Sequence, residues 1–129
     1  MAEGGRLRVL VVDDASLVRL YYREALERVG YEVEEALNGL EALEKLLLAP
    51  ADLLIVDVNM PQMDGLTFLK VLRRQELATG SIPAIVITTE AKQQDAEAAR
   101  RAGANFYLTK PVKPEVLVQY AGLLCGAPA

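Results

Sequence analysis

The sequence predicts a doubly wound α/β domain in which five parallel strands lie in the order 2-1-3-4-5 and helices cover both faces. Two observations carry this prediction. Five short apolar runs alternate with amphipathic helical patterns at roughly 20–30 residues per unit, as strand-helix-strand repeats do. The 129 residues are 52% hydrophobic, which is enough for one domain with a substantial core.

The first unit runs from residue 7 to residue 30. Residues 7–12 form a nearly continuous, valine-rich apolar run, which is typical of a strand covered on both faces. Asp14 lies where a helix cap is expected, and Gly30 lies where the following helix should end. Between them, apolar side chains recur every three or four residues and should face the core: Val18, Tyr22, Ala25, Leu26 and Val29.

The second unit is a strand at 31–36 and a helix at 39–48, and the third begins with a buried strand at 53–57. The third helix starts near Asp64, which we expect to cap it, and ends before a turn at 79–81. Leucines line the expected buried sides of both helices: Leu40, Leu43, Leu46 and Leu47 in the first, and Leu66, Leu69 and Leu72 in the second.

The last two units place strands at 82–88 and 105–109, with helices at 91–102 and 114–124. The apolar residues of helix 91–102 are all alanines, which bury little area, so this helix should be the most weakly anchored of the five. It is therefore a candidate movable or partner-binding element; the alternative is a helix that simply buries little side-chain area. We expect the folded domain to span 6–124, between flexible termini at 1–5 and 125–129.

Composition excludes several classes of function. The net formal charge of −4 comes without a basic stripe, which argues against nucleic-acid binding. The absence of histidine excludes a histidine-based triad, a zinc site containing histidine and a phosphohistidine carrier. The sequence has neither a membrane-spanning run nor a secretory apolar segment, so it predicts a cytoplasmic protein without a membrane partner. Cys125 has no second cysteine to pair with and is expected to pack in the last helix.

Polar residues end four of the apolar runs: Asp13 with Asp14, Asp57, Thr88 and Lys110. Each alone has a simpler role, as a helix cap, a strand-end threonine or a solvated lysine. Together, at one edge of a parallel sheet, they form a candidate active site. Three close carboxylates repel one another, and oxygen-only ligands favour Mg²⁺ or Mn²⁺ over zinc. Asp57 could then attack phosphorus and form an acyl phosphate, with Thr88 and Lys110 binding the phosphoryl oxygens.

Four segments, VVDDAS, LLIVDVNMPQMDG, ITTEA and YLTKP, give the chain its family resemblance. From Arg6 to Leu124 it resembles the receiver domains of two-component response regulators, and most closely the single-domain CheY-like chemotaxis regulators, which have a flavodoxin-like fold. The resemblance implies that Asp57 is the phosphorylated residue of a signalling protein that catalyses its own phosphoryl transfer and dephosphorylation. It also implies that the Lys110–Pro111 peptide bond is cis.

The remaining site roles are implied by the same resemblance. The metal ligands would be Asp13, Asp14, Asp57 and the backbone carbonyl of Asn59. The residues that respond to phosphorylation would be Thr88, Tyr107 and Lys110. The residues that tune hydrolysis of the acyl phosphate would be Asn59 and Glu90.

The resemblance further implies two kinds of partner. The phosphodonor would be a histidine kinase, a phosphotransfer domain or a small molecule. The downstream protein, such as a flagellar switch, would bind the surface of helix 91–102, strand 105–109 and helix 114–124. The chain could act alone in chemotaxis or motility signalling, or be a receiver excised from a larger regulator.

Two other functions on related folds fit the residues less well. A phosphatase of the haloacid-dehalogenase type needs a second aspartate two positions after its nucleophile, where this chain has Asn59. A flavodoxin-like electron carrier needs hydroxyl and glycine residues in its first loop, where this chain has Asp13 and Asp14.

Overall fold

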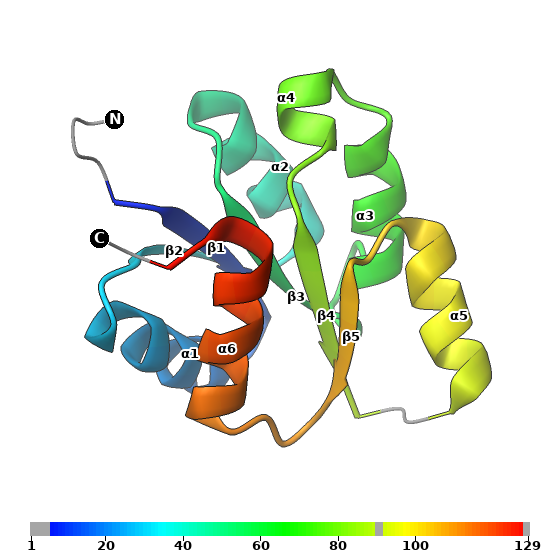
Figure 1. The fold of residues 1–129 in the computed structure, drawn as a ribbon. Coiled ribbons are helices and arrows are strands. Elements are labelled where there is room, and N and C mark those ends of the chain that lie inside the picture. The colour runs from blue at the N-terminus through cyan, green and yellow to red at the C-terminus, as the bar shows by residue number, and fades with distance from the viewer. Residues whose placement is uncertain (1–5, 90–91, 128–129) are drawn as a thin grey trace.

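The computed structural model describes residues 6–89 and 92–127. Within them, five parallel strands form one sheet in the order β2-β1-β3-β4-β5, as the sequence predicts (Figure 1). The strands are β1 (Arg8–Val12), β2 (Glu32–Ala36), β3 (Leu53–Asp57), β4 (Ala84–Thr88) and β5 (Phe106–Thr109). Four of them begin one or two residues later than predicted.

The helices lie in two layers against this sheet, with α1 and α6 on one face and α2, α3 and α5 on the other (Figure 1). Their bounds are α1 (Ser16–Arg28), α2 (Gly39–Leu48), α3 (Gly65–Arg73), α4 (Leu77–Gly80), α5 (Gln93–Ala102) and α6 (Pro114–Cys125). The one-turn helix α4 overlaps the turn predicted at 79–81 and is an element that the sequence prediction lacked.

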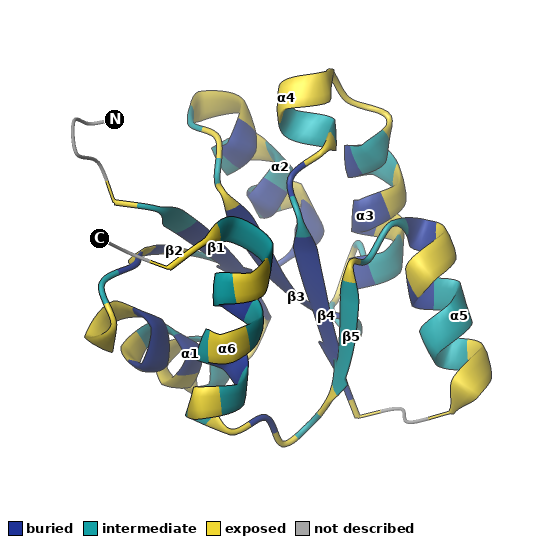
Figure 2. Ribbon diagram, viewed as in Figure 1, coloured by how far each residue is buried: buried dark blue, intermediate teal, exposed yellow. Residues whose placement is uncertain are grey.

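The sheet separates two hydrophobic cores because neighbouring side chains of each strand point to opposite faces. Val9 and Val11 pack with Leu117 beneath α1 and α6. Leu10 and Val12 pack with Phe68 beneath α2, α3 and α5. The central strands β3 and β4 are buried along their whole length, whereas β5 is less buried (Figure 2). Coverage of the central strands on both faces is what their continuous apolar runs predict.

The buried stripe of α2 differs from the predicted one. Of the four leucines predicted to face inward, Leu46 is buried and Leu43 is partly buried, whereas Leu40 and Leu47 are 48% and 80% exposed. The buried positions of α2 are Gly39, Ala42 and Leu46. Gly39 and Leu46 lie about 100° around the helix from Leu40 and Leu47, since a helix turns by that angle per residue. The reason is close packing on α3: a Cβ on Gly39 would come within 3.0 Å of the Phe68 Cβ. Gly39 and Ala42 therefore face inward beside Leu46, and Leu40 and Leu47 remain outside.

The ends of α1 also differ from expectation. Asp14 is exposed and does not cap α1, because the N-cap residue is Ala15 and it makes no side-chain cap hydrogen bond. Instead, Oδ1 of Asp13 accepts a hydrogen bond from the Ala15 amide at 2.9 Å. At the other end, Val29 is 42% exposed rather than buried. The Asp64 cap on α3 is confirmed, since its side chain accepts from the Thr67 amide at 2.9 Å.

Helix α5 is held by small residues, as its sequence suggests. Its buried side chains are Ala99 and Ala102, and it ends at Gly103, whose φ is +112°. From α3, the Arg73 guanidinium donates two hydrogen bonds to the Gly103 carbonyl, at 3.1 and 2.7 Å. Residue 91 of the predicted helix and the predicted flexible segment 1–5 lie outside the described residues. In the part of the chain that is described, no helix is both long and apolar enough to cross a membrane.

Candidate functional site

The predicted polar edge forms at the carboxyl ends of the strands. Asp13 directly follows β1, Asp57 and Thr88 end β3 and β4, and Lys110 directly follows β5. Because β1 and β3 are neighbours in the sheet, their two aspartates lie close together. One carboxylate oxygen from each of Asp13, Asp14 and Asp57 lies within 4.8 Å of the others.

Lys110 neutralises part of this charge. Its Nζ lies 3.1 Å from Oδ1 of Asp57 and 3.6 Å from Oδ2 of Asp13, the longer distance being an ion pair beyond hydrogen-bonding range. Its backbone amide donates to the Thr88 carbonyl at 2.7 Å, which ties the loop to the end of β4. The Lys110–Pro111 peptide bond is cis, as expected. The ammonium group is therefore held directly beside the Asp57 carboxylate.

Burial dominates the electrostatics of the site. Asp13 and Asp57 are 1% and 6% exposed, and burial raises the pKa of both carboxyls. The Asp13 charge raises the pKa of Asp57 further, while Lys110 lowers both values. Burial acts to lower the pKa of Lys110, but its contacts with Asp57 and Asp13 outweigh this and raise it. With all four groups ionised, three carboxylates against one ammonium leave an excess of negative charge that favours a cation.

The donor set fits a magnesium-type ion. Asp13 uses Oδ1 to accept from Ala15, and its buried Oδ2 has no hydrogen-bond partner among the described residues. A buried carboxylate oxygen without a hydrogen bond is costly, and a cation would satisfy it. All the side-chain ligands are oxygens, which suits Mg²⁺ or Mn²⁺. Asn59 lies two residues after Asp57, where its backbone carbonyl could complete the set.

Gly65 fixes the distance between α3 and the Asp57 backbone. Its amide donates to the Val58 carbonyl at 2.9 Å, and a Cβ at this position would lie 2.2 Å from the Asp57 carbonyl oxygen. No side chain fits there. The sequence predicted only a helix start near Asp64, although the glycine at the first helical position was a signal of close approach.

Thr88 and Tyr107 border the same cavity of about 50 Å³ beside the site. The other lining residues are Val58, Leu66 and Asp95. Oδ2 of Asp95 is buried and has no hydrogen-bond partner among the described residues, and no sequence pattern had indicated this residue. The structure thus brings the predicted pair Thr88 and Tyr107 together, whereas Glu90 lies outside the described residues.

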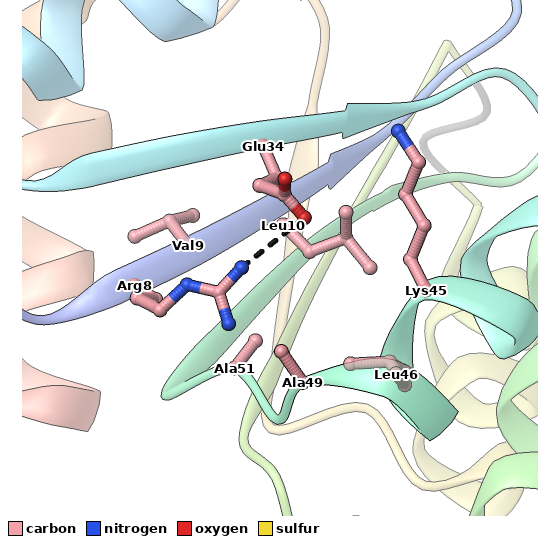
Figure 3. A pocket seen from close by; sticks show the side chains of 8 residues that line it. All are labelled: Arg8, Val9, Leu10, Glu34, Lys45, Leu46, Ala49 and Ala51. Carbon is pink, nitrogen blue, oxygen red and sulfur yellow. Dashed lines mark ion pairs between the residues drawn. The ribbon is translucent and has the colours of Figure 1, made fainter. Parts of the chain in front are cut away.

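Two other hollows differ in size and position. One, of about 10 Å³, lies near the start of β1, at the opposite end of that strand from Asp13 (Figure 3). It is lined by the ion pair of Arg8 with Glu34 and holds about one water at most. The other, of about 290 Å³, lies beside Lys110 and is lined mainly by apolar side chains of α1 and of the loop before α6. The second hollow therefore opens beside the ammonium group.

Comparisons with known proteins show which family the chain resembles. The family model described as response regulator receiver domain matches residues 9–121. The chain is 42% identical to the chemotaxis protein CheY1 of Helicobacter pylori over 122 residues, covering 93% of this chain and 98% of that protein. It is 38% identical over 112 residues to the sensor protein EvgS of Escherichia coli, covering 87% of this chain and 9% of EvgS.

Solved structures show the same likeness. The chemotaxis protein CheY4 of Vibrio cholerae superposes with a TM-score of 0.88 at 37% identity, covering 93% of this chain and 99% of that one. A CheY-like response regulator receiver domain protein from Methanospirillum hungatei gives a TM-score of 0.84 at 28% identity, covering 92% and 93%.

Proposed function

The chain belongs to the response regulator receiver domain family, and from this premise we propose that Asp57 is its phosphoacceptor. The observation that carries the proposal is the position of Lys110, whose Nζ lies 3.1 Å from Oδ1 of a buried Asp57 beside two further carboxylates. A lone pair of opposite charges would be an ordinary ion pair. An ammonium that contacts two of three clustered carboxylates at the ends of parallel strands is instead suited to binding a phosphoryl group and a cation together.

The chemistry is one phosphoryl transfer followed by hydrolysis. A carboxylate oxygen of Asp57 attacks phosphorus, and the bond from phosphorus to the donor nitrogen or oxygen breaks, so that the donor leaves with the electron pair. Lys110 binds phosphoryl oxygens and offsets their charge. A Mg²⁺ or Mn²⁺ ion held by Asp13, Asp14, Asp57 and the carbonyl of Asn59 would, when bound, neutralise further charge on these oxygens. Water later cleaves the acyl phosphate, at a rate set by Asn59 and Glu90.

The stored phosphoryl group then changes the surface of α5, β5 and α6. The Thr88 hydroxyl donates to a phosphoryl oxygen, and Tyr107 turns into the cavity that both residues border. The cavity volume of about 50 Å³ exceeds that needed for one water, so it leaves room for movement of these side chains. Since Tyr107 lies on β5, its movement alters the face to which the downstream protein binds.

The phosphodonor is a histidine kinase, a phosphotransfer domain or a small phosphodonor. The protein works in the cytoplasm, and the match to almost the whole of CheY1 favours a stand-alone role in chemotaxis, with a flagellar switch as target. A receiver within a larger protein is the alternative, because the match to EvgS covers only 9% of that sensor.

Intact mass spectrometry tests the proposal directly. Wild type and Asp57→Asn are incubated with Mg²⁺ and acetyl phosphate, and their masses are followed over time. We expect wild type to gain the mass of one phosphoryl group and Asp57→Asn to gain none. A wild-type protein that never gains this mass would contradict the proposal.

A further inference from the structure

The backbone of Asp13 is held by an arginine from α1. The Arg19 guanidinium donates from one terminal nitrogen to the Asp13 carbonyl at 2.7 Å. The Arg19 side chain is 13% exposed, so this contact is shielded from solvent. Arg19 contacts the backbone carbonyl of Asp13 and not its carboxylate. This contact fixes the backbone at Asp13, whose carboxylate is the most buried of the three in the cluster.

The same guanidinium is held in turn by Glu35 on β2. Nε of Arg19 lies 2.8 Å from Oε1 of Glu35. Hydrogen bonds from Arg19 and Arg23 lower the pKa of Glu35, so the carboxylate stays charged. The backbone carbonyl of Glu35 accepts a hydrogen bond from Nζ of Lys45, a side chain that extends from α2 toward β2 (Figure 3). Glu35 is thus anchored from both faces of the sheet.

These contacts leave one polar atom of Asp13 for the site. Its amide donates to the Ala36 carbonyl at 3.0 Å, its carbonyl accepts from Arg19, and Oδ1 accepts from Ala15. The remaining atom, Oδ2, is buried without a hydrogen-bond partner among the described residues and belongs to the carboxylate cluster. Fixing three of the four polar groups determines where the fourth one points.

We propose that Arg19, anchored by Glu35, is a positioning residue that holds Asp13 in the orientation needed to bind the divalent cation. A guanidinium suits this role because its rigid fork can bond a carbonyl and a carboxylate at once, which a lysine ammonium on a flexible stem does less well. Groups that orient metal ligands typically contribute about 10–100-fold to metal affinity. The inference rests on the proposed function, since it concerns the cation of that same site.

Titration of Mg²⁺ by isothermal calorimetry, with the protein unphosphorylated, tests this role apart from activity. We expect Arg19→Ala to weaken Mg²⁺ binding by about tenfold or more, and Arg19→Lys to weaken it by a smaller factor. Arg23→Ala is the matched control: Arg23 lies one turn along α1 and pairs with Glu35 and Glu27. It should bind Mg²⁺ within about twofold of wild type. Thermal unfolding without Mg²⁺ shows whether each variant is folded.

Two outcomes separate this inference from the function it rests on. If wild type binds no Mg²⁺, the proposed function fails. If wild type binds Mg²⁺ and Arg19→Ala binds it equally well, or if Arg23→Ala loses as much affinity as Arg19→Ala, Arg19 is not a positioning residue. If Arg19→Ala does not fold, Arg19→Lys and Glu35→Gln are titrated in its place. Mg²⁺ affinity equal to that of wild type in both variants would overturn the inference.

Discussion

Gly65→Ala should damage phosphorylation without touching any reacting group. The added Cβ would lie 2.2 Å from the Asp57 carbonyl oxygen, while ordinary contacts of this kind begin at 3.4 Å, so the start of α3 and the end of β3 must separate by about 1.2 Å. Displacement of a reacting group by about 1 Å can cost roughly 100-fold in rate. Overpacking should also cost about 1–3 kcal/mol in the free energy of unfolding.

The assay is the rate of acetyl phosphate-driven phosphorylation with Mg²⁺, read by intact mass, together with thermal unfolding of each protein. Gly122→Ala is the matched control, since nothing lies within 4 Å of a Cβ at that position in α6. This control should keep the wild-type rate and gain up to about 1 kcal/mol in stability, because alanine has a higher helix propensity than glycine. A Gly65→Ala protein that is phosphorylated within twofold of the wild-type rate would refute the reasoning.

Three further predictions concern charge and capping. Lys110→Met should raise the pKa of Asp57 further, because it removes the nearest cation. It should also slow phosphorylation by acetyl phosphate at least tenfold, as measured by intact mass. An unchanged rate would exclude a role for the ammonium group. Because burial raises the pKa of Asp13 above its ordinary value of 3.8, the folded protein binds this proton more tightly than the unfolded chain, and its stability should fall as pH rises through the raised value. Thermal unfolding in EDTA should therefore show Asp13→Asn gaining stability over wild type at pH 7 but not below pH 3.8; equal gains at both pH values would contradict this. Asn38→Ala should cost about 1 kcal/mol in denaturant unfolding, since Asn38 caps α2 by accepting from the Glu41 amide at 2.9 Å, whereas the exposed Leu47→Ser should cost little.

Patterns with a strong local cause could be predicted from the sequence. The strand order follows from alternating strands and helices, and the convergence of Asp13, Asp57, Thr88 and Lys110 follows from the parallel sheet. The Asp64 cap was predicted because capping depends on residues within one helical turn.

Features that depend on tertiary approach were not predicted. Hydrophobic periodicity favoured Leu40 and Leu47 as buried residues of α2, but packing on α3 selects the smaller Gly39 and Ala42. Asp14 has the right residue type and place for a cap, yet the hydrogen bond at the start of α1 is made by Asp13, whose carboxylate is buried in the site. Arg19 and Gly65 act on groups 6 and 8 residues away, Asp13 and Asp57, across a change of element. No local pattern reports such contacts.

The sheet that separates the two cores should also make the two helices of the proposed target surface contribute independently to stability. Helix α5 packs into one core through Ala99 and helix α6 into the other through Leu117, while β5 contributes Tyr107 to the first and Leu108 to the second. Substitutions without shared neighbours usually add within about 0.3–0.5 kcal/mol, so a double-mutant cycle between Ala99 and Leu117 should give almost no coupling energy. Double-mutant cycles of Ala99 with Tyr107, and of Leu117 with Leu108, should give larger coupling energies, because each pair shares a core. Substitutions in α5 and α6 would then affect stability almost independently, and β5 is the element that contacts both cores.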